Sequence, residues 1–144
     1  DKVQKLLDLK VRDMGVEPFL LSSSLLGVIA QRLVRILCDN CKQPSSPNDA
    51  ERAVLKMAPG ESAIIHRAVG CEECSGTGYR GRTGIYEVVE VDDTLRGMIH
   101  EGASEHEMEH YARTRTPGIR EDGLRKVREG ATTLEEVVRV TYSE

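Results

Sequence analysis

Four cysteines, arranged as two C-x-x-C pairs, constrain the fold of this chain more than any other feature of its sequence. The pairs are Cys38 with Cys41 and Cys71 with Cys74, and they use every cysteine of the 144 residues. Each C-x-x-C turn lets two sulfurs approach one ion, and Zn²⁺ favours four thiolates in a tetrahedron. We therefore predict one structural zinc site. Because a closed four-cysteine site keeps no open position for water or substrate, its expected role is to stabilise the fold.

Two other interpretations of the cysteines stay open, namely redox dithiols and unbonded cysteines in a core. Neither pair opens a helix after a predicted strand, as a thioredoxin-like motif would. The start of the sequence lacks the basic and apolar regions of a signal peptide, so we expect a reducing, cytosolic compartment. In such a compartment, paired cysteines usually bind metal or carry out redox chemistry instead of forming disulfides. Three glycines around the second pair, Gly70, Gly76 and Gly78, would let its loop turn closely.

The composition is that of an ordinary soluble protein with an aliphatic core. There is no Trp and one Phe, so Leu, Ile, Val, Ala and Met must supply the packing. The net charge of −4 gives no general attraction to nucleic acid. The longest apolar stretch, residues 25–30, is far shorter than the roughly 20 residues that a membrane span requires. We therefore expect neither nucleic-acid binding nor a transmembrane helix.

Helical spacing predicts two helices before the first cysteine pair. The first covers residues 3–13 and stops at Gly15. The second begins at an N-cap supplied by the serine run 22–24 and continues to about Leu37, because apolar residues recur every three or four positions. These residues are Leu26, Ile29, Leu33 and Leu37. The polar residues Gln31, Arg32 and Arg35 would then form a stripe on one side of this helix.

Between the cysteine pairs and after them, turn signals mark further elements. A short helix is predicted between Ser46-Pro47 and Pro59-Gly60. Residues 83–91 are rich in β-branched side chains and predict a strand. The last 50 residues predict three or four short helices, because caps and breakers recur along them. Ser104 with Glu107 and Thr132 with Glu135 match the capping box, Gly102 and Gly130 would close helices, and Pro117 separates two more.

One motif in the helical part formally matches a metalloprotease. His106-Glu107-Met108-Glu109-His110 fits H-E-x-x-H, which places two imidazoles on one helix face with the Glu as base. The apolar side of this helix is expected at Met108, Tyr111 and Ala112, which leaves both histidines exposed and without a third ligand. We therefore prefer a solvated helix. The sequence also lacks the glycine-rich phosphate loops G-x-x-x-x-G-K-[ST] and G-x-G-x-x-G.

Several consecutive segments of the sequence occur in the same order in one known family. They are RDMGVEPFLLSSSLLGVIAQRLVRILC, the first C-x-x-C pair, GCEECSGTGYRGRTGIYEVVEVDD and TPGIREDGLRKVREGATTLEEVVRVT. Over about residues 12–142, the chain resembles the C-terminal part of the type II secretion system assembly ATPase, the cytoplasmic E-component motor. Homologous type IV pilus assembly ATPases share the cysteine module and the GYRGRTGIYE-like block. The EPFLLSSSLLGVIAQRLVR segment is more similar to the secretion branch.

The resemblance implies a fold that is mostly α with a small β component. The chain would be the C-terminal fragment of a RecA-like α/β ATPase, with an inserted Cys₄ zinc subdomain and a C-terminal helical subdomain. Residues 1–37 would be a helical segment of the ATPase core, residues 38–80 the zinc-binding subdomain, and residues 81–144 a strand followed by helices. Residues 1–11 depart from the family pattern, which suggests an engineered or truncated start. The four cysteines correspond to the zinc ligands of the family.

The resemblance also implies a function. Intact members are hexamers, peripheral at the bacterial inner membrane, that couple ATP hydrolysis to pseudopilus assembly and protein export. Their Walker A and Walker B motifs and catalytic Glu lie upstream of the matching part. ATP and Mg²⁺ therefore belong to the full-length protein, and this chain is not expected to hydrolyse ATP alone. The implied partners are other subunits of the same ring and inner-membrane secretion platform proteins, with no nucleic acid.

Four arginines are candidates for contact with a neighbouring subunit or with nucleotide held elsewhere in the ring. They are Arg32, Arg35, Arg80 and Arg82. Arginine suits carboxylate and phosphate recognition, but it is also an ordinary surface residue, so plain solvation is the alternative. Two other functions stay open for the whole chain, a type IV pilus assembly ATPase and a free-standing zinc-ribbon interaction module.

Overall fold

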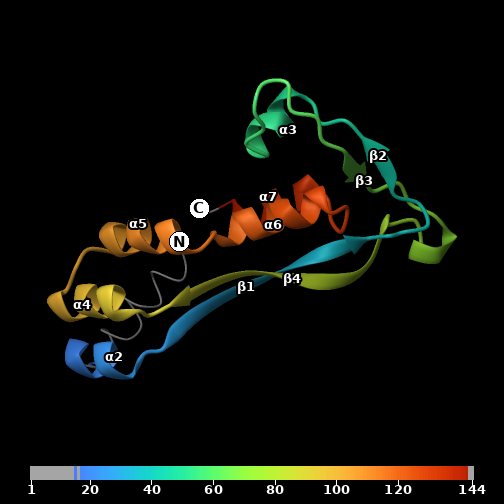
Figure 1. Cartoon of the computed structure of the whole chain (residues 1–144). Coiled ribbons are helices and arrows are strands. Elements are labelled where there is room, and N and C mark those ends of the chain that lie inside the picture. Colours follow the sequence, from blue (N-terminus) through green and yellow to red (C-terminus); the bar gives the residue numbers. More distant parts are fainter. Residues whose placement is uncertain (1–14, 16, 143–144) are drawn as a thin grey trace. The chain divides into compact units, whose positions relative to one another are not determined.

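The computed structural model describes residues 15 and 17–142 and combines short helices with two small sheets (Figure 1). The helix predicted over residues 3–13 lies outside the described residues. The elements are α2 (Pro18–Ser24), β1 (Gly27–Leu37), β2 (Gln43–Ser45), α3 (Asp49–Val54), β3 (Ile65–Arg67), the 3₁₀ turn η2 (Glu72–Cys74), β4 (Tyr79–Glu90), α4 (Asp93–Glu101), α5 (Glu105–Arg115), α6 (Ile119–Arg128) and α7 (Leu134–Thr141).

The chain divides into two compact units. Among the described residues, unit 1 comprises residues 15, 17–31 and 86–118, and unit 2 comprises residues 32–85 and 119–142. Strands β1 and β4 pair in a two-stranded sheet and run in opposite directions (Figure 1). Each of these strands contributes one part to unit 1 and the other part to unit 2. No helix in the described part of the chain is long and apolar enough to cross a membrane.

The helix predicted to end at about Leu37 is wrong, because Gly27–Leu37 forms the strand β1. Exposure alternates along β1, so that Ile29 and Leu33 are exposed while Val34 is buried. Apolar residues lie on both faces of the strand, and their spacing therefore imitated a helical repeat. Pairing with β4 and the β-branched side chains of this segment favour the strand. The serine run ends helix α2 instead of starting a helix.

Unit 1 is built around one apolar cluster that α4 and α5 share with the end of β4. Its buried members are Val89, Val91, Leu95, Ile99, Met108 and Ala112. Helix α2 packs against α4. The predicted capping box at Ser104 and Glu107 is confirmed at the start of α5, and Gly102 closes α4 with a positive φ of 71°, as expected. An ion pair between the buried Glu87 and the partly exposed Arg113 joins the sheet to α5, with Arg113 Nη1 2.6 Å from Glu87 Oε1.

Unit 2 combines the insert between the cysteine pairs with helices α6 and α7. Strands β2 and β3 pair in antiparallel fashion, with Pro44 opposite His66. Helices α6 and α7 pack together, and their contact requires Gly123, because a Cβ there would lie 2.5 Å from Val137 Cγ1. The predicted C-terminal strand is confirmed and extends from Tyr79 to Glu90. The four helices α4 to α7 agree with the three or four predicted for the C-terminal part.

Two predicted helix starts in unit 2 are shifted. The helix between the cysteine pairs is present as α3, but Asn48 caps it instead of Ser46, and Glu51 completes the box. Thr133, not Thr132, caps α7 through the N–H of Glu136. The sequence Thr-Thr-Leu-Glu-Glu fits the capping pattern in either register, which explains the error.

Candidate metal centre and arginine cluster

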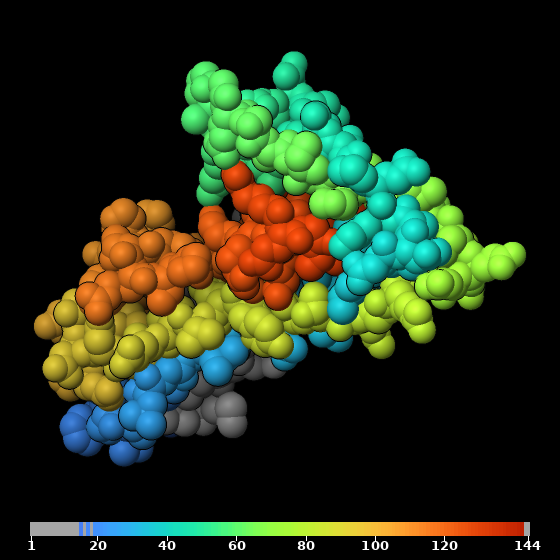
Figure 2. All heavy atoms as spheres, turned by 45° about the vertical axis from the view of Figure 1, so that its right-hand side comes forward, coloured from blue at the N-terminus to red at the C-terminus, as the bar shows by residue number. Residues whose placement is uncertain are grey.

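The first cysteine pair sits in a turn directly after β1. The N–H groups of Cys41 and Lys42 donate to the carbonyl of Cys38 at 3.3 and 2.9 Å. The N–H of Cys38 donates to the carbonyl of Gly78 at 2.9 Å, next to the start of β4. The end of the β1–β4 strand pair therefore positions this turn. The segments that carry the two pairs, coloured cyan and yellow-green, lie side by side in Figure 1 and Figure 2.

The second pair brackets the 3₁₀ turn η2, and glycine makes its loop possible. The N–H of Gly76 donates to the carbonyl of Cys71 at 2.8 Å. Gly70 has a φ of 112°, and a Cβ at this position would lie 2.5 Å from the carbonyl oxygen of Gly76. Gly78 is equally restricted, because its Cβ would lie 2.7 Å from the Cβ of Ala68. These glycines are needed for close backbone approach, as the sequence predicts.

All four cysteine sulfurs lie within 4.8 Å of one another. Sγ–Sγ distances are 3.9 Å from Cys38 to Cys71, 3.9 Å from Cys41 to Cys74 and 3.8 Å from Cys71 to Cys74. A tetrahedron with Zn–S bonds of about 2.3 Å has edges of about 3.8 Å. The sulfurs are too far apart for a disulfide, whose S–S bond measures about 2.05 Å. The donor set and its spacing therefore fit a tetrahedral metal ion.

Backbone and side-chain donors surround the sulfurs. Burial opposes ionisation of Cys74, but the N–H groups of Cys71 and Gly78, at 3.2 and 3.1 Å, outweigh it and lower the thiol pKa. The Asn40 amide, 3.3 Å away, lowers the pKa of Cys71. Burial raises the pKa of Cys41 despite the N–H of Gly70. These donors favour the thiolate form of two ligands, and a bound cation would favour it at all four.

The four candidate arginines lie in unit 2 and divide into two pairs. Arg32 Nη1 donates to the carbonyl of Val140, and Arg35 Nη2 lies 2.8 Å from Glu136 Oε1. Both contacts join β1 to helix α7. Arg80 and Arg82 are exposed on β4, and the nearest recorded carboxylate is Glu73 Oε2, 3.9 Å from Arg80 Nη1. The first pair therefore anchors the C-terminal helix, while the second pair points to solvent.

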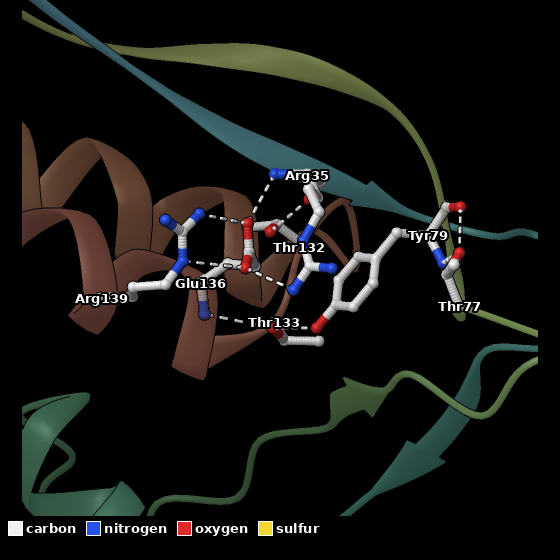
Figure 3. Close-up of polar contacts among 7 residues, drawn as sticks. All are labelled: Arg35, Thr77, Tyr79, Thr132, Thr133, Glu136 and Arg139. Carbon is white, nitrogen blue, oxygen red and sulfur yellow. Dashed lines mark hydrogen bonds and ion pairs between the residues drawn. The ribbon is translucent and has the colours of Figure 1, made fainter.

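Arg35 belongs to a cluster organised by Glu136, whose side chain is 2% exposed (Figure 3). The two carboxylate oxygens accept from the guanidinium and the backbone N–H of Arg35 and from the guanidinium of Arg139. Burial alone would raise the pKa of Glu136, but these donors lower it to about 2. Thr132 Oγ1 donates to the carbonyl of Arg35 at 2.7 Å. The cluster therefore ties α7 to β1 through a buried, ionised carboxylate.

Two residues of this cluster, Glu136 and Tyr79, were not among the candidates from the sequence. The ring of Tyr79 lies under the guanidinium of Arg35, with the Cζ atom 4.0 Å from the ring centroid. Its hydroxyl lies 2.9 Å from Thr133 Oγ1. Arg35, Tyr79 and Arg82, with Thr77 and Gly81, line a hollow of about 280 Å³. In sequence, Glu136 is indistinguishable from a capping glutamate, so only the fold reveals its role.

The H-E-x-x-H motif lies on α5 with both histidines exposed, as predicted. Glu107 Oε2 accepts from the N–H and the hydroxyl of Ser104 at 2.8 and 2.6 Å. This carboxylate therefore caps the N-terminus of α5. Among the described residues, the four cysteines are the one group of three or more His, Cys, Asp or Glu side chains close enough to hold a metal ion.

Comparison with known proteins decides the family. Residues 6–139 match the model of a family described as type II/IV secretion system protein. The chain belongs to this family. The match covers most of the sequence and agrees with the resemblance carried by the ordered segments, from the glycine-rich cysteine loop to the C-terminal helices.

Individual members of the type II/IV secretion family point to the secretion branch. The chain is 60% identical over 132 residues to the type II secretion system protein E of Pseudomonas aeruginosa, and 55% identical over 132 residues to the type II secretion system ATPase E of Vibrio cholerae. Each alignment covers 92% of this chain and 26% of the relative. The type IV pilus assembly ATPase PilB of Thermus thermophilus is 44% identical over 135 residues, 15% of its length. The chain thus spans about a quarter of the length of its type II relatives.

Proposed function

We propose that this chain is the zinc-containing C-terminal part of the hexameric ATPase that powers type II protein secretion by assembling the pseudopilus. The observation that carries the proposal is the 60% identity to a type II secretion system protein E over 92% of the chain. The near-tetrahedral spacing of Cys38, Cys41, Cys71 and Cys74 supports Zn²⁺ as the bound ion. The ion would hold both C-x-x-C turns against the strand pair, and its chemistry would be structural.

The rest of the ATPase would supply the nucleotide chemistry. Within the RecA-like architecture of the family, we assign residues 1–37 to the ATPase core, 38–80 to the zinc subdomain and 81–144 to the C-terminal strand and helices. ATP and Mg²⁺ would bind outside this chain, since it holds no Walker motif. The full-length protein would act in the cytoplasm, peripheral at the bacterial inner membrane. Its partners would be the other ring subunits and inner-membrane platform proteins.

The arginines fit into this proposal in two ways. Arg32 and Arg35 would contribute indirectly, by anchoring helix α7 to β1. Arg80 and Arg82 are exposed and would contact a neighbouring subunit or its nucleotide. Arginine is suited to either role because its planar fork binds carboxylate and phosphate oxygens bidentately.

A segment exchange tests the function. In the Pseudomonas aeruginosa protein E, the 132 aligned residues are replaced by the corresponding part of this chain, and the chimera is expressed in cells that lack protein E. We expect secretion of a type II substrate into the medium. A second chimera carrying Cys71→Ser and Cys74→Ser should accumulate poorly and fail to secrete, while one carrying Glu72→Ala should secrete normally. A stable native chimera that does not secrete contradicts the proposal.

The second candidate, a type IV pilus assembly ATPase, rests on the 44% identity to PilB. The same exchange into PilB, scored by pilus formation in cells without PilB, separates the two functions. We expect no pili from this second chimera. Pili from the PilB chimera, together with no secretion from the protein E chimera, would reverse the assignment.

A further inference from the structure

The arginine hollow of unit 2 has the character of an oxyanion-binding site. It measures about 280 Å³ and is lined by Arg35, Thr77, Tyr79, Gly81 and Arg82. Two of these five residues carry guanidinium groups, and no carboxylate lines the hollow. Arg82 is exposed, and no hydrogen bond or ion pair is recorded for it within the described residues. Arg35 is paired with Glu136, so the hollow presents the positive charge of Arg82, for which the described part of the chain supplies no recorded carboxylate partner.

Arg35 is held in position before any ligand arrives. Its guanidinium stacks on the Tyr79 ring at 4.0 Å, and its Nη2 donates to the buried carboxylate of Glu136 at 2.8 Å. Tyr79 is fixed in turn by its hydroxyl contact with Thr133. The Arg35 side chain is nevertheless 49% exposed, so its remaining N–H groups can reach a ligand. Because the side chain is already ordered, binding costs little further rotamer entropy.

The lining of the hollow favours a carboxylate over a phosphate. Phosphate sites in proteins usually use a glycine-rich loop of backbone N–H groups or the N-terminus of a helix. The residues that line this hollow come from strands β1 and β4 and from Thr77, and they include no helix residue. A guanidinium fork binds carboxylate and phosphate oxygens alike, so it is the missing cradle that favours a carboxylate side chain here.

Unit 1 of the same chain is rich in carboxylates. Its described residues include nine acidic and three basic side chains, a formal charge of −6. Those of unit 2 sum to +2, or to zero once Zn²⁺ and four thiolates are counted. Glu101 at the end of α4 and Glu105 at the start of α5 lie four residues apart, and neither has a recorded hydrogen bond or ion pair within the described residues. The corner between α4 and α5 is thus a concentrated source of carboxylates.

These observations point to a contact between copies: the hollow at Arg35 and Arg82 receives the carboxylates of Glu101 and Glu105 from a second copy of this chain. The two surfaces are different, so the contact is heterologous and repeats from copy to copy, which is the arrangement that closes rings. The inference rests on the proposed function, which calls for a ring. It specifies which surfaces meet and which charges make them complementary.

Reciprocal charge reversal tests the contact in the chain itself. Variant A carries Arg82→Glu, and variant B carries Glu101→Lys with Glu105→Lys. Sedimentation velocity over a concentration series measures self-association. We expect the native chain to associate and to dissociate as salt is added. Each variant alone should associate at least about tenfold more weakly, because like charges then face each other. A 1:1 mixture should recover, because every interface between A and B again joins opposite charges.

Several controls make the outcome decisive. Lys56→Glu and Glu90→Lys reverse exposed charges in units 2 and 1 and should leave association unchanged. Unchanged zinc content and circular dichroism would show that the variants are folded.

A native chain that stays monomeric overturns the inference, as does a mixture of variants A and B that fails to associate. A triple variant combines Arg82→Glu, Glu101→Lys and Glu105→Lys in one chain, and recovery in this variant but not in the mixture of A and B would overturn a contact between copies. Binding of Mg-ADP that is lost with Arg82→Glu would assign the hollow to nucleotide instead. None of these readouts depends on secretion.

Discussion

Different interactions stabilise the interior of each of the two units of the chain. Unit 1 relies on an apolar cluster that α4 and α5 form with the end of β4, helped by the partly buried ion pair of Glu87 and Arg113. Unit 2 adds to its apolar core four cysteine sulfurs within 4.8 Å and a buried glutamate bound by two arginines. Apolar burial depends little on metal or pH, whereas a thiolate metal site depends on both and a buried carboxylate depends on pH. The stability of unit 2 should therefore respond to removal of the metal, a change that should leave unit 1 unaffected.

Removing the metal is expected to give the largest difference between the units. A structural zinc site contributes roughly 10–16 kcal/mol of apparent binding free energy at neutral pH. Cys74→Ser, or a strong chelator, should therefore unfold most of unit 2. Hydrogen exchange followed by mass spectrometry should show lost protection in residues 32–85 and 119–142, with protection retained around Leu95 and Met108. Glu73→Ala, in the same loop, should leave the exchange pattern unchanged. Equal loss of protection in both units would show that the metal stabilises both units, which contradicts the prediction.

Truncating a side chain of the apolar cluster tests the stability of unit 1. Met108 is 2% exposed, and Met108→Ala should destabilise unit 1 by about 2–4 kcal/mol, because the cavity loses both apolar burial and packing. Urea unfolding with and without chelator measures this loss. Met98→Ala provides the control, since this side chain is only partly buried against the same cluster and should cost less. A loss that disappears when the metal is removed would mean that the units are not separately stabilised.

Acid should weaken unit 2 through Glu136. Its pKa is lowered to about 2 in the folded chain, from an ordinary value of 4.5. A lowered carboxylate pKa stabilises the fold above the unfolded value, so this contribution is complete above about pH 4.5 and is lost as pH falls towards 2. Comparison of the native chain with Glu136→Gln should show a difference of about 2–3 kcal/mol at pH 7 that shrinks below pH 4.5. Measuring both proteins at each pH cancels the acid release of a metal ion from the cysteines, which they share.

The matching control for this titration is Glu129→Gln, which removes an exposed carboxylate from the same unit. Its effect should stay below about 0.5 kcal/mol at every pH, because exposed ion pairs contribute little. A pH-independent difference between the native chain and Glu136→Gln would show that Glu136 acts through packing and not through its charge.

Features set by neighbouring residues were predictable from the sequence, and features set by distant ones were not. The C-x-x-C spacing predicted each cysteine turn, and Ser104 with Glu107 predicted the start of α5, because both patterns act over a few residues. The meeting of the two turns, 33 positions apart, was predictable only because zinc favours four thiolates. The strand β1 was missed because its apolar residues occupy both faces, and only pairing with β4 decides between strand and helix. The Arg35–Glu136 pair joins residues 101 positions apart, a contact that no local pattern encodes.

The order of the metal ligands along the chain has a consequence for synthesis on the ribosome. Cys74 completes the ligand set long before Glu136 is translated, and the cysteine-bearing turns are already joined by the hydrogen bond from Cys38 to Gly78. A metal ion bound by the four cysteines would therefore close this loop before α6 and α7 are synthesised. Early closure removes chain entropy from every later step. We expect β1 and β4 to be paired by the time α6 and α7 are synthesised. Glu136 on α7 then samples fewer conformations before it reaches Arg35 on β1.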